Sequence, residues 1–325
     1  MAILVTGGTG DVGRHLVRRL LDLGENPVAF DISPHTQGLD QVLAGTTFVK
    51  GNVLNLGELI TVMKTHKITK VAHLASLLTS DGEARPFEAL QVNTMGTATV
   101  LEACRILDIE RIVYTSTSSV YGSTSEDSTI SEDHPKNPTN AYGISKHAAE
   151  VYGHIYSQKY GIEYVAIRPR IILGAGQRND TGAMKILGVA EILDKLQKGL
   201  PARIPYEPSE KLPVTHPADA AQCILKACQI SKLLHNAYNV MTGAFSYLEI
   251  GRAFEKAVNG SKVEVGMIQG GQKTARRFGN YDISAARSEL MYEPEYGIER
   301  IVSEIVEYSR GLRNSLEGLR NKTEG

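Results

Sequence analysis

The sequence predicts an α/β fold, in which a doubly wound parallel sheet is followed by a smaller C-terminal α/β domain. Three observations lead to this prediction. Short β-rich runs alternate with helical patterns through the first half of the 325 residues, a glycine-rich turn joins the first run to the first helix, and the pattern becomes less regular after Pro169. Strands that alternate with helices form right-handed βαβ units, and the resulting parallel sheet carries helices on both faces.

The elements of the first half follow from local periodicity. Val12–Leu23 repeats Leu and Val at helical spacing and stops at Gly24, whereas runs rich in β-branched residues predict strands. Residues 1–170 are therefore expected to form one sheet domain, which also receives a strand near 236–241. Strands are expected at Ala2–Thr6, Pro27–Asp31, Thr46–Lys50, Lys70–Ala75, Arg111–Ser116 and Glu163–Arg168, and helices at Val12–Leu23, Leu56–His66, Phe87–Leu107 and Ala141–Tyr160.

Residues 171–325 are expected to form mainly a substrate-binding domain. Gly174–Gly182 is rich in glycine and polar residues, which suits a loop at a binding site. A proline-punctuated stretch follows between Pro201 and Pro217. Helices are expected at Ala183–Lys198, Ala218–Ser231, Ser246–Val258, Ser284–Leu290 and Ile298–Arg310, and strands at Tyr238–Met241 and Lys262–Met267.

The composition limits the partners. The formal net charge is -1 and charged residues make up 22%, so no electrostatic argument favours nucleic acid or an anionic membrane. Cys104, Cys223 and Cys228 form no CxxC pair, so neither a metal site nor a disulfide framework is expected, and a reducing cytoplasm fits best. The N-terminus lacks the pattern of a signal peptide, and no apolar run is long enough to span a membrane.

The turn after the first strand carries a phosphate-binding pattern. Thr6-Gly7-Gly8-Thr9-Gly10-Asp11-Val12-Gly13 has the GxxGxxG spacing. Such glycines allow a tight turn, a close approach to a pyrophosphate and close helix packing, and the helix N-terminus offers free N–H groups to the phosphate. The position between a strand and a helix favours this interpretation over an ordinary turn. It predicts a Rossmann-type NAD-binding domain, with cofactor contacts from Gly7, Gly10, Asp11, Val12 and Gly13.

Further cofactor contacts are expected where the next strands end. Asp31 ends the second strand, where a carboxylate accepts hydrogen bonds from ribose hydroxyls and repels a 2′-phosphate; no Arg or Lys follows within Ile32-Ser33-Pro34. NAD is therefore favoured over NADP, the alternative being an aspartate that caps a turn. After the third strand, Asn52 and Val53 are expected near the adenine. After the fourth, the backbone of Leu74, Ala75 and Ser76 is expected beside the cofactor, with His73 as a structural residue.

A tyrosine and a lysine one helical turn apart predict the catalytic group. Tyr142 and Lys146 share one helix face. A lysine ammonium nearby and the positive nicotinamide ring are expected to lower the tyrosine pKa, so that Tyr142 exchanges a proton with a substrate hydroxyl as hydride moves. Thr117 follows the fifth strand, at the sheet edge where ligands bind in such folds.

These motifs resemble the extended short-chain dehydrogenase/reductases, also called the NAD-dependent epimerase/dehydratase family, over residues 1 to about 170. Thr115–Gly122 is similar to the family's S-S-(S/T)-x-x-VYG motif, which implies that Thr117 holds the substrate hydroxyl. The resemblance also implies that Asn93, in an NxxGT segment, orders the cofactor or a water, unless it is a buried helix amide. Arg168-Pro169 is similar to the family's R-P pair. The family's usual homodimer implies pairing through residues 87–107 and 141–160.

The resemblance also narrows the set of reactions that the protein is expected to catalyse. Ser118 and Ser119 stand where dehydratases have an acid pair, and Ile171 and Leu212, beside Lys211, stand where nucleotide-sugar enzymes commonly have Asn and Arg. Leu74–Leu78, Tyr238–Val240 and Asp282–Arg287 are instead similar to the short-chain L-threonine 3-dehydrogenases, although those carry P-S-S-I-A-x-F-G in place of Thr115–Gly122.

We therefore expect hydride transfer at a secondary alcohol or ketone of a small polar substrate. The alternatives are nucleotide-sugar 4-epimerisation and, in another class, a non-catalytic NAD(H)-sensing protein. The substrate candidates are Thr117, Ser118, Arg170 and Arg178, the two arginines as partners for a carboxylate or phosphate. Arg276 and Arg277 form a further basic pair that either meets an anion or is simply solvated.

Overall fold

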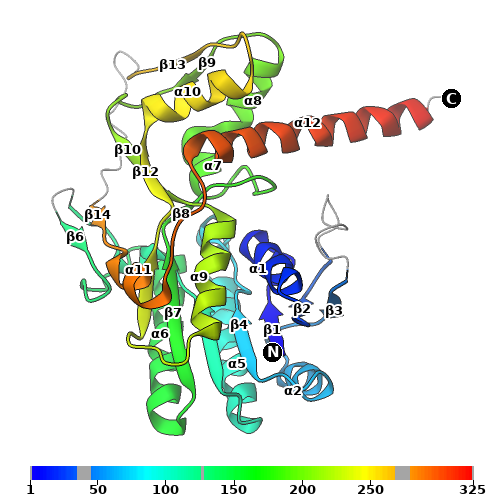
Figure 1. Ribbon diagram of the computed structural model, residues 1–325, viewed down its shortest axis with the longest axis vertical. Coiled ribbons are helices and arrows are strands. Elements are labelled where there is room, and N and C mark those ends of the chain that lie inside the picture. The colour runs from blue at the N-terminus through cyan, green and yellow to red at the C-terminus, as the bar shows by residue number, and fades with distance from the viewer. Residues whose placement is uncertain (1, 35–44, 126–127, 268–278, 324–325) are drawn as a thin grey trace. The chain divides into compact units, whose positions relative to one another are not determined.

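The computed structural model describes residues 2–34, 45–125, 128–267 and 279–323, with backbone only beyond residue 312. The chain divides into two compact units (Figure 1). The first consists of Met1–Arg170, Pro217–Met241 and Gly279–Glu293, and the second of Ile171–His216, Thr242–Phe278 and Pro294–Gly325. The chain therefore crosses between the units several times. Arg276 and Arg277 lie outside the described residues.

A seven-stranded sheet forms the centre of the first unit. All of its strand pairs are parallel, and the order is β11-β7-β5-β4-β1-β2-β3. The order reverses between β1 and β4, and such a switch point is where ligands bind in open α/β sheets. The expected fold class is confirmed. The strands are β1 (Ile3–Thr6), β2 (Val28–Asp31), β3 (Thr47–Lys50), β4 (Lys70–His73), β5 (Arg111–Thr115), β7 (Glu163–Pro169) and β11 (Ala237–Val240).

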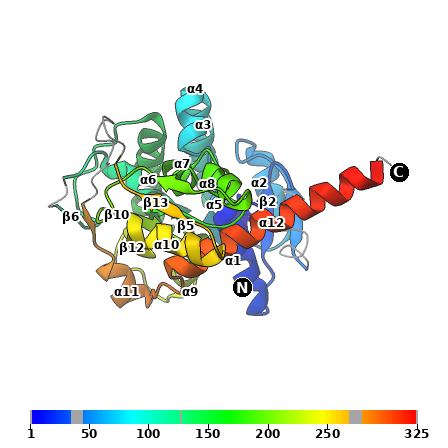
Figure 2. The ribbon, with the colours of Figure 1, turned by 90° about the horizontal axis from the view of Figure 1, so that it is seen from above.

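Helices cover both faces of this sheet. Along β1, Ile3 and Val5 belong to one buried cluster and Leu4 to another, as the two-residue period of a strand requires. The first cluster includes residues of α1 (Asp11–Asp22), α9 (Pro217–Gln229) and α11 (Ser284–Leu290). The second includes residues of α2 (Leu56–Thr65), α5 (Gly96–Ile106) and α6 (Ala141–Tyr160). Figure 2 shows α9 and α11 on one side of β5, with α5 and α6 on the other.

The segment expected as one long helix at Phe87–Leu107 is not regular. It begins as α4 (Pro86–Ala89), widens into a π-helical turn, η1 (Leu90–Met95), and continues as α5. A short helix, α3 (Thr79–Ala84), precedes it. The expected long helix is present as one continuous helical segment, but its middle turn is π-helical, which the sequence pattern did not indicate; Asn93 lies in this turn. Wide turns of this kind are frequent at functional sites.

Basic side chains at the amino ends of two strands hold the end of α9. Arg111 Nη1 donates to the carbonyl oxygens of Ala227 at 2.9 Å and Ile230 at 2.6 Å. Lys70 Nζ donates to the Cys228 carbonyl at 2.8 Å. The last carbonyls of a helix have no partner within it, so these cations both pair them and oppose the negative end of the helix dipole.

The second unit is smaller and contains two small sheets. One has the order β12-β10-β8 and the other pairs β13 with β9. The expected helix Ala183–Lys198 is interrupted at Gly188, whose φ is +63°, and is two helices. The strands are β8 (Ile171–Ile172), β9 (Ala202–Ile204), β10 (Lys211–Thr215), β12 (Gly243–Ser246) and β13 (Val263–Val265), and the helices are α7 (Gly182–Leu187), α8 (Val189–Gln197), α10 (Tyr247–Ala257) and α12 (Ile298–Thr323).

A last strand pair, β6 (Thr129–Ile130) with β14 (Asn280–Tyr281), lies in the first unit. Among the described residues, no helix combines the length and the apolar character needed to cross a membrane.

Candidate functional site

The glycine-rich turn between β1 and α1 leaves no room for a side chain at Gly7 or Gly13. Gly7 has a φ of +68°, and a Cβ built on it would lie 2.7 Å from the Ala75 backbone nitrogen. A Cβ on Gly13 would collide with the Gly7 carbonyl oxygen. Gly10 precedes α1 in extended conformation and makes no side-chain cap. At its glycines the turn therefore presents backbone groups at a helix N-terminus, and this arrangement fits the pyrophosphate of a dinucleotide.

Asp31 lies at the end of β2 and contacts this turn. Its Oδ2 accepts hydrogen bonds from the Thr9 hydroxyl at 2.7 Å and the Thr9 backbone N–H at 3.2 Å, and its Oδ1 accepts from Ile32 N–H at 2.8 Å. The carboxylate thus ties β2 to the glycine turn, as in the capping alternative. A carboxylate has about four acceptor positions, so this role is compatible with ribose binding, which stays a prediction.

Asn52 and Val53 follow β3. The Asn52 side chain is exposed and its oxygen accepts the Leu54 N–H at 3.0 Å. Val53 is buried, and a Cβ on Gly96 would lie 2.9 Å from its Cγ2. The Val53 side chain therefore packs on α5, which leaves its backbone and the Asn52 amide as candidates for the adenine.

His73, at the end of β4, is the centre of a buried hydrogen-bond chain. The Thr97 hydroxyl donates to the Asn93 carbonyl at 2.6 Å, so it accepts from His73 Nε2 at 3.0 Å. The Thr6 hydroxyl then donates to Nδ1 at 2.6 Å. Burial, and secondly the charge of Lys146, lower the pKa of His73 to about 3. His73 is therefore a neutral structural residue, and Thr6 in turn accepts the N–H groups of Leu74 and Ala75.

Tyr142 and Thr117 come together at the carboxyl edge of the sheet. Tyr142 is the second residue of α6, whose N-cap Asn140 accepts the Gly143 N–H at 2.7 Å. Thr117 immediately follows the β5–Ser116 segment; its hydroxyl donates to the Ser119 hydroxyl at 3.3 Å, and it lies close enough to the Tyr142 phenol to act on the pKa of that group. Burial raises the pKa of Tyr142 to about 12, and the Thr117 contact opposes this rise. The expected lowering of the tyrosine pKa is thus wrong for the chain alone, because loss of hydration outweighs the contact with Thr117.

Lys146 is buried one turn along α6. Its Nζ lies 4.6 Å from the centre of the Tyr114 ring. Burial lowers the pKa of Lys146 to about 7, and the charge of Glu150 opposes this effect. The lysine can therefore carry or release a proton near neutral pH.

Asn93 holds the segment after β4 against α6. Its Oδ1 accepts the Leu77 N–H at 2.8 Å, and its Nδ2 donates to the Leu77 carbonyl at 3.1 Å and the Ser145 hydroxyl at 3.0 Å. Ser145 lies between Tyr142 and Lys146 in sequence. These contacts match the buried-amide alternative, and a direct role toward the cofactor stays a prediction. Glu83 adds a second contact to α6, because its Oε1 accepts the Ala141 N–H at 3.1 Å.

A buried ion pair behind the site was not anticipated from the sequence. Arg168 contacts Glu150 through two bonds of 2.9 and 2.8 Å, and it also donates to the Tyr121 hydroxyl at 2.7 Å. That hydroxyl donates to Asn239 Oδ1 at 2.7 Å. The helix position of Glu150, four residues after Lys146, was the available signal. The network ties α6, β7 and β11 together.

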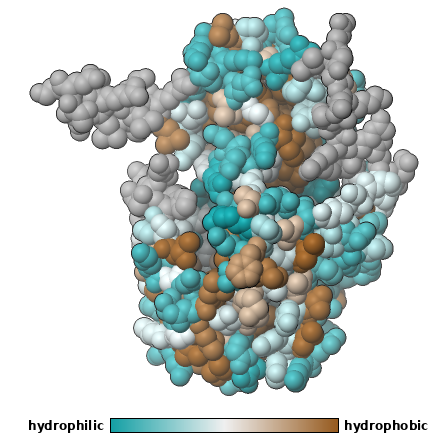
Figure 3. Space-filling view, turned by 180° about the vertical axis from the view of Figure 1, so that it is seen from behind, coloured by the Kyte–Doolittle hydropathy of each residue, from teal (hydrophilic) through white to brown (hydrophobic). Residues whose placement is uncertain are grey.

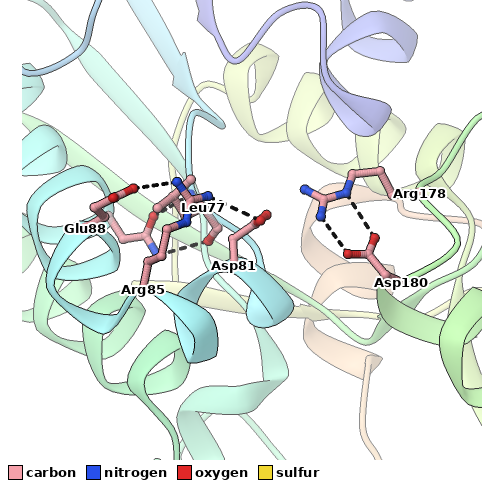
Figure 4. A network of polar contacts seen from close by, with 7 residues as sticks. Leu77, Asp81, Arg85, Glu88, Arg178 and Asp180 are labelled. Atoms are coloured by element: carbon pink, nitrogen blue, oxygen red, sulfur yellow. Dashed lines mark hydrogen bonds and ion pairs between the residues drawn. The ribbon is translucent and has the colours of Figure 1, made fainter.

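The two candidate anion-binding arginines have different surroundings. Arg170 Nη1 donates to the Ser118 hydroxyl at 2.9 Å in the first unit. Arg178, in the second unit, makes a two-point contact with Asp180 at 3.0 and 2.6 Å (Figure 4). Figure 4 also shows the Arg85 guanidinium between Asp81 and Glu88 in the first unit. A substrate anion at Arg178 has to compete with Asp180.

The fold and this site define a dinucleotide-binding α/β protein with the residues of a hydride-transfer centre. A family model described as the NAD dependent epimerase/dehydratase family matches residues 3–240. The chain belongs to this family, and the predicted resemblance to the extended short-chain dehydrogenase/reductases is confirmed.

Relatives of two kinds are similar to the chain. A UDP-glucose 4-epimerase from Halalkalibacterium halodurans is 37% identical over 169 residues, which are 52% of this chain and 50% of the relative. The match thus spans about half the length of that protein. A UDP-glucuronic acid 4-epimerase from Bacillus cereus in complex with NAD has a TM-score of 0.79 at 26% identity, covering 96% of this chain and 99% of the other.

The other kind is a dehydrogenase. A partial consensus L-threonine 3-dehydrogenase has a TM-score of 0.79 at 24% identity, covering 96% of this chain and 100% of the other; this likeness shows the fold alone. The expected cofactor, NAD, is confirmed by the family's description and by the complex with NAD.

Proposed function

We propose that the protein transfers hydride between NAD and a secondary alcohol, or the corresponding ketone, of a small polar substrate. The observation that carries this proposal is that Thr117 and Tyr142 lie together, both buried, at the carboxyl edge of the sheet, with the buried Lys146 one helical turn further along α6. In oxidation, the Tyr142 oxygen accepts the proton of the substrate hydroxyl while Thr117 holds the same hydroxyl in place. When bound, NAD accepts the hydride and adds a positive ring charge that favours the phenolate.

Asp31 supports NAD over NADP as the partner of this site. Its carboxylate lies at the end of β2 beside the glycine turn. A 2′-phosphate placed there meets a negative charge, whereas ribose hydroxyls find an acceptor. We therefore propose that Asp31 selects the cofactor, with contacts from Asn52, Val53 and the segment Leu74–Ser76.

Nucleotide-sugar 4-epimerisation is the second candidate function. It is favoured by the similarity to two 4-epimerases, both at 26% identity or more. Against it stand Ile171 and Leu212, where the family resemblance expects polar contacts to the diphosphate. Both reactions begin with the same hydride step, and they differ in whether the keto form leaves or is reduced again in place.

The experiment follows NADH at 340 nm with purified protein, NAD, and a panel of hydroxy acids, amino alcohols, free sugars and UDP- and GDP-sugars. Tyr142→Phe removes the proton acceptor, and we expect a loss of about 100-fold or more, with NAD binding retained in a thermal-shift assay. Tyr160→Phe, an exposed tyrosine on the same helix, is the matched control and should remain active.

The products distinguish the candidates. Net NADH from a small substrate supports the dehydrogenase. Epimer formation without net NADH supports the epimerase and contradicts our first choice. Full retention of cellular function by Tyr142→Phe would instead indicate a non-catalytic NAD(H)-sensing protein.

We further propose that the protein is a homodimer that pairs through α4, η1, α5 and α6. Large apolar side chains are exposed along α6 at residues 144, 151, 152 and 155, and on α4 and η1 at residues 87, 90 and 95. The α6 positions share one helix face, and α4 and α5 both contact α6. Figure 3 shows apolar side chains gathered on the side of the first unit that these helices cover. Contiguous apolar surface of this kind marks an interface.

A reducing, cytoplasmic location is proposed on the cysteines. Cys104, Cys223 and Cys228 are all free and buried. Burial also raises the pKa of each thiol, which makes them unreactive. Structural thiols without disulfides are typical of reducing compartments.

A further inference from the structure

We propose that Arg170 and Ser118 bind a carboxylate of the substrate, so that the substrate is a small hydroxy acid or its keto form. This inference rests on the proposed hydride transfer at Thr117 and Tyr142, and it names the class of molecule that reacts there.

Three elements fix the position of the Arg170 side chain. Its backbone N–H donates to the Val240 carbonyl of β11 at 2.9 Å. Nη1 donates to the Ser118 hydroxyl at 2.9 Å, and the guanidinium carbon lies 5.4 Å from the centre of the Tyr281 ring of β14. Ser118 itself is buried, at 6% exposure, and begins the short 3₁₀ helix η2 (Ser118–Tyr121). The cation is therefore held in one place rather than solvated on a long, free side chain.

The position of Ser118 brings this cation close to the reacting group. Ser118 directly follows Thr117, and consecutive Cα atoms lie only about 3.8 Å apart. The Arg170 guanidinium is thus bonded to the residue that directly follows Thr117, so a small molecule whose hydroxyl contacts Thr117 can present a second polar group to Arg170. A 2- or 3-hydroxy acid carries its carboxylate one or two bonds from the carbon that bears the hydroxyl, so both groups lie close together in such a molecule. In a nucleotide sugar, the diphosphate is attached across the sugar ring from the carbon that is epimerised.

The chemistry of the guanidinium matches a carboxylate. A guanidinium has five N–H donors in a planar fork, so a contact to Ser118 is compatible with a two-point contact to a carboxylate. The Glu150–Arg168 pair, two residues earlier in β7, shows the same two-point geometry inside this fold. Burial lowers the pKa of Arg170, and the phenols of Tyr281 and Tyr121 oppose this effect. An added carboxylate further stabilises the charged form.

The experiment measures binding rather than turnover. Wild-type protein with NADH is titrated by calorimetry with pyruvate, 2-oxobutanoate and acetoacetate, each paired with its methyl ester, and with inorganic phosphate. We expect at least one acid to bind about tenfold or more tightly than its ester, because a charge-assisted contact is lost in the ester. Arg170→Gln should remove this preference and Arg170→Lys should restore it in part. Arg18→Gln, an exposed arginine paired with Asp22, should leave it unchanged.

Each outcome decides the inference separately from the proposed function. A preference for the acid that persists in Arg170→Gln overturns it, as does equal binding of every acid and its ester by the wild type. The inference is also overturned if phosphate binds through Arg170 more tightly than all the acids, because the site would then be a phosphate site rather than a carboxylate site. Tyr142→Phe should keep the binding preference while losing hydride transfer. If Arg170-dependent binding is present but no hydride transfer is found, the proposed function fails and the carboxylate site stands.

Discussion

At the scale of single residues, Lys146 gives the stability of the protein a defined pH dependence. Its pKa falls from 10.5 to about 7 on burial. Between these values the unfolded chain binds more protons than the folded chain, so the free energy of unfolding rises with pH. Below about pH 7, Lys146 is protonated in both the folded and the unfolded chain, so its effect on the free energy of unfolding no longer changes with pH. The slope is at most about 1.4 kcal/mol per pH unit for one proton.

Urea denaturation at pH 7, 8 and 9 measures this effect. Lys146→Met removes the titrating group, so its stability should rise less between pH 7 and 9 than that of the wild type. Lys198→Met removes an exposed lysine that pairs with Asp194, and it should follow the wild type. Parallel pH profiles for wild type and Lys146→Met would show that the buried lysine does not titrate in this range.

At the scale of elements, the end of α9 depends on Arg111. Its side chain is 3% exposed and pairs with Glu163, while Nη1 donates hydrogen bonds to the Ala227 and Ile230 carbonyls. Arg111→Met leaves these acceptors without their cation, and we expect the free energy of unfolding to fall by roughly 3 kcal/mol. Arg111→Lys should recover part of the loss.

Chemical denaturation of both variants provides the measurement. Arg105→Met is the control, because Arg105 forms an ion pair within one helix, with Glu102, and such pairs contribute little. A loss for Arg111→Met no larger than that for Arg105→Met would mean that the α9 carbonyls are satisfied by other groups.

The same scale explains how far the sequence predicts this protein. The strand–glycine turn–helix unit and the Tyr142–Lys146 spacing depend on residues that are neighbours along the chain, so local patterns indicate them. In the π-helical turn at Leu90–Met95, Asn93 contacts Ser145, fifty-two positions away. The periodicity of apolar residues along the segment does not indicate a contact with so distant a residue. The sequence therefore predicted one helix without this wide turn.

The electrostatics of the site were predicted less well for a related reason. The helical spacing places Lys146 near Tyr142, which suggested a lowered tyrosine pKa. The extent of burial is set by the tertiary packing of α6, and it raises that pKa to about 12 instead. Arg168, the partner of Glu150, lies on a different element, so the sequence pattern did not predict their ion pair either.

At the scale of the whole molecule, the exposed face of α6 leads to the last prediction. If α4, η1, α5 and α6 pair across a twofold axis, each apolar side chain on α6 meets the same helix of the second copy. Val151 and Ile155 are 44% and 47% exposed. The double variant Val151→Glu, Ile155→Glu places two charges from each copy in this interface, where they lose hydration and repel each other.

Light scattering after gel filtration, at matched protein concentrations, measures the mass. We expect a dimer for the wild type and a monomer for the double variant, with circular dichroism showing that the fold is retained. Leu234→Glu is the control, because this leucine is 64% exposed but follows α9, which packs on the opposite face of the sheet. A wild type that is monomeric, or a double variant that stays dimeric, would place the α6 face in solvent. Its apolar side chains would then need another partner, because exposed apolar surface of this extent favours aggregation. The same helix contributes Tyr142 and Lys146, so such aggregation would involve the helix that carries the candidate site.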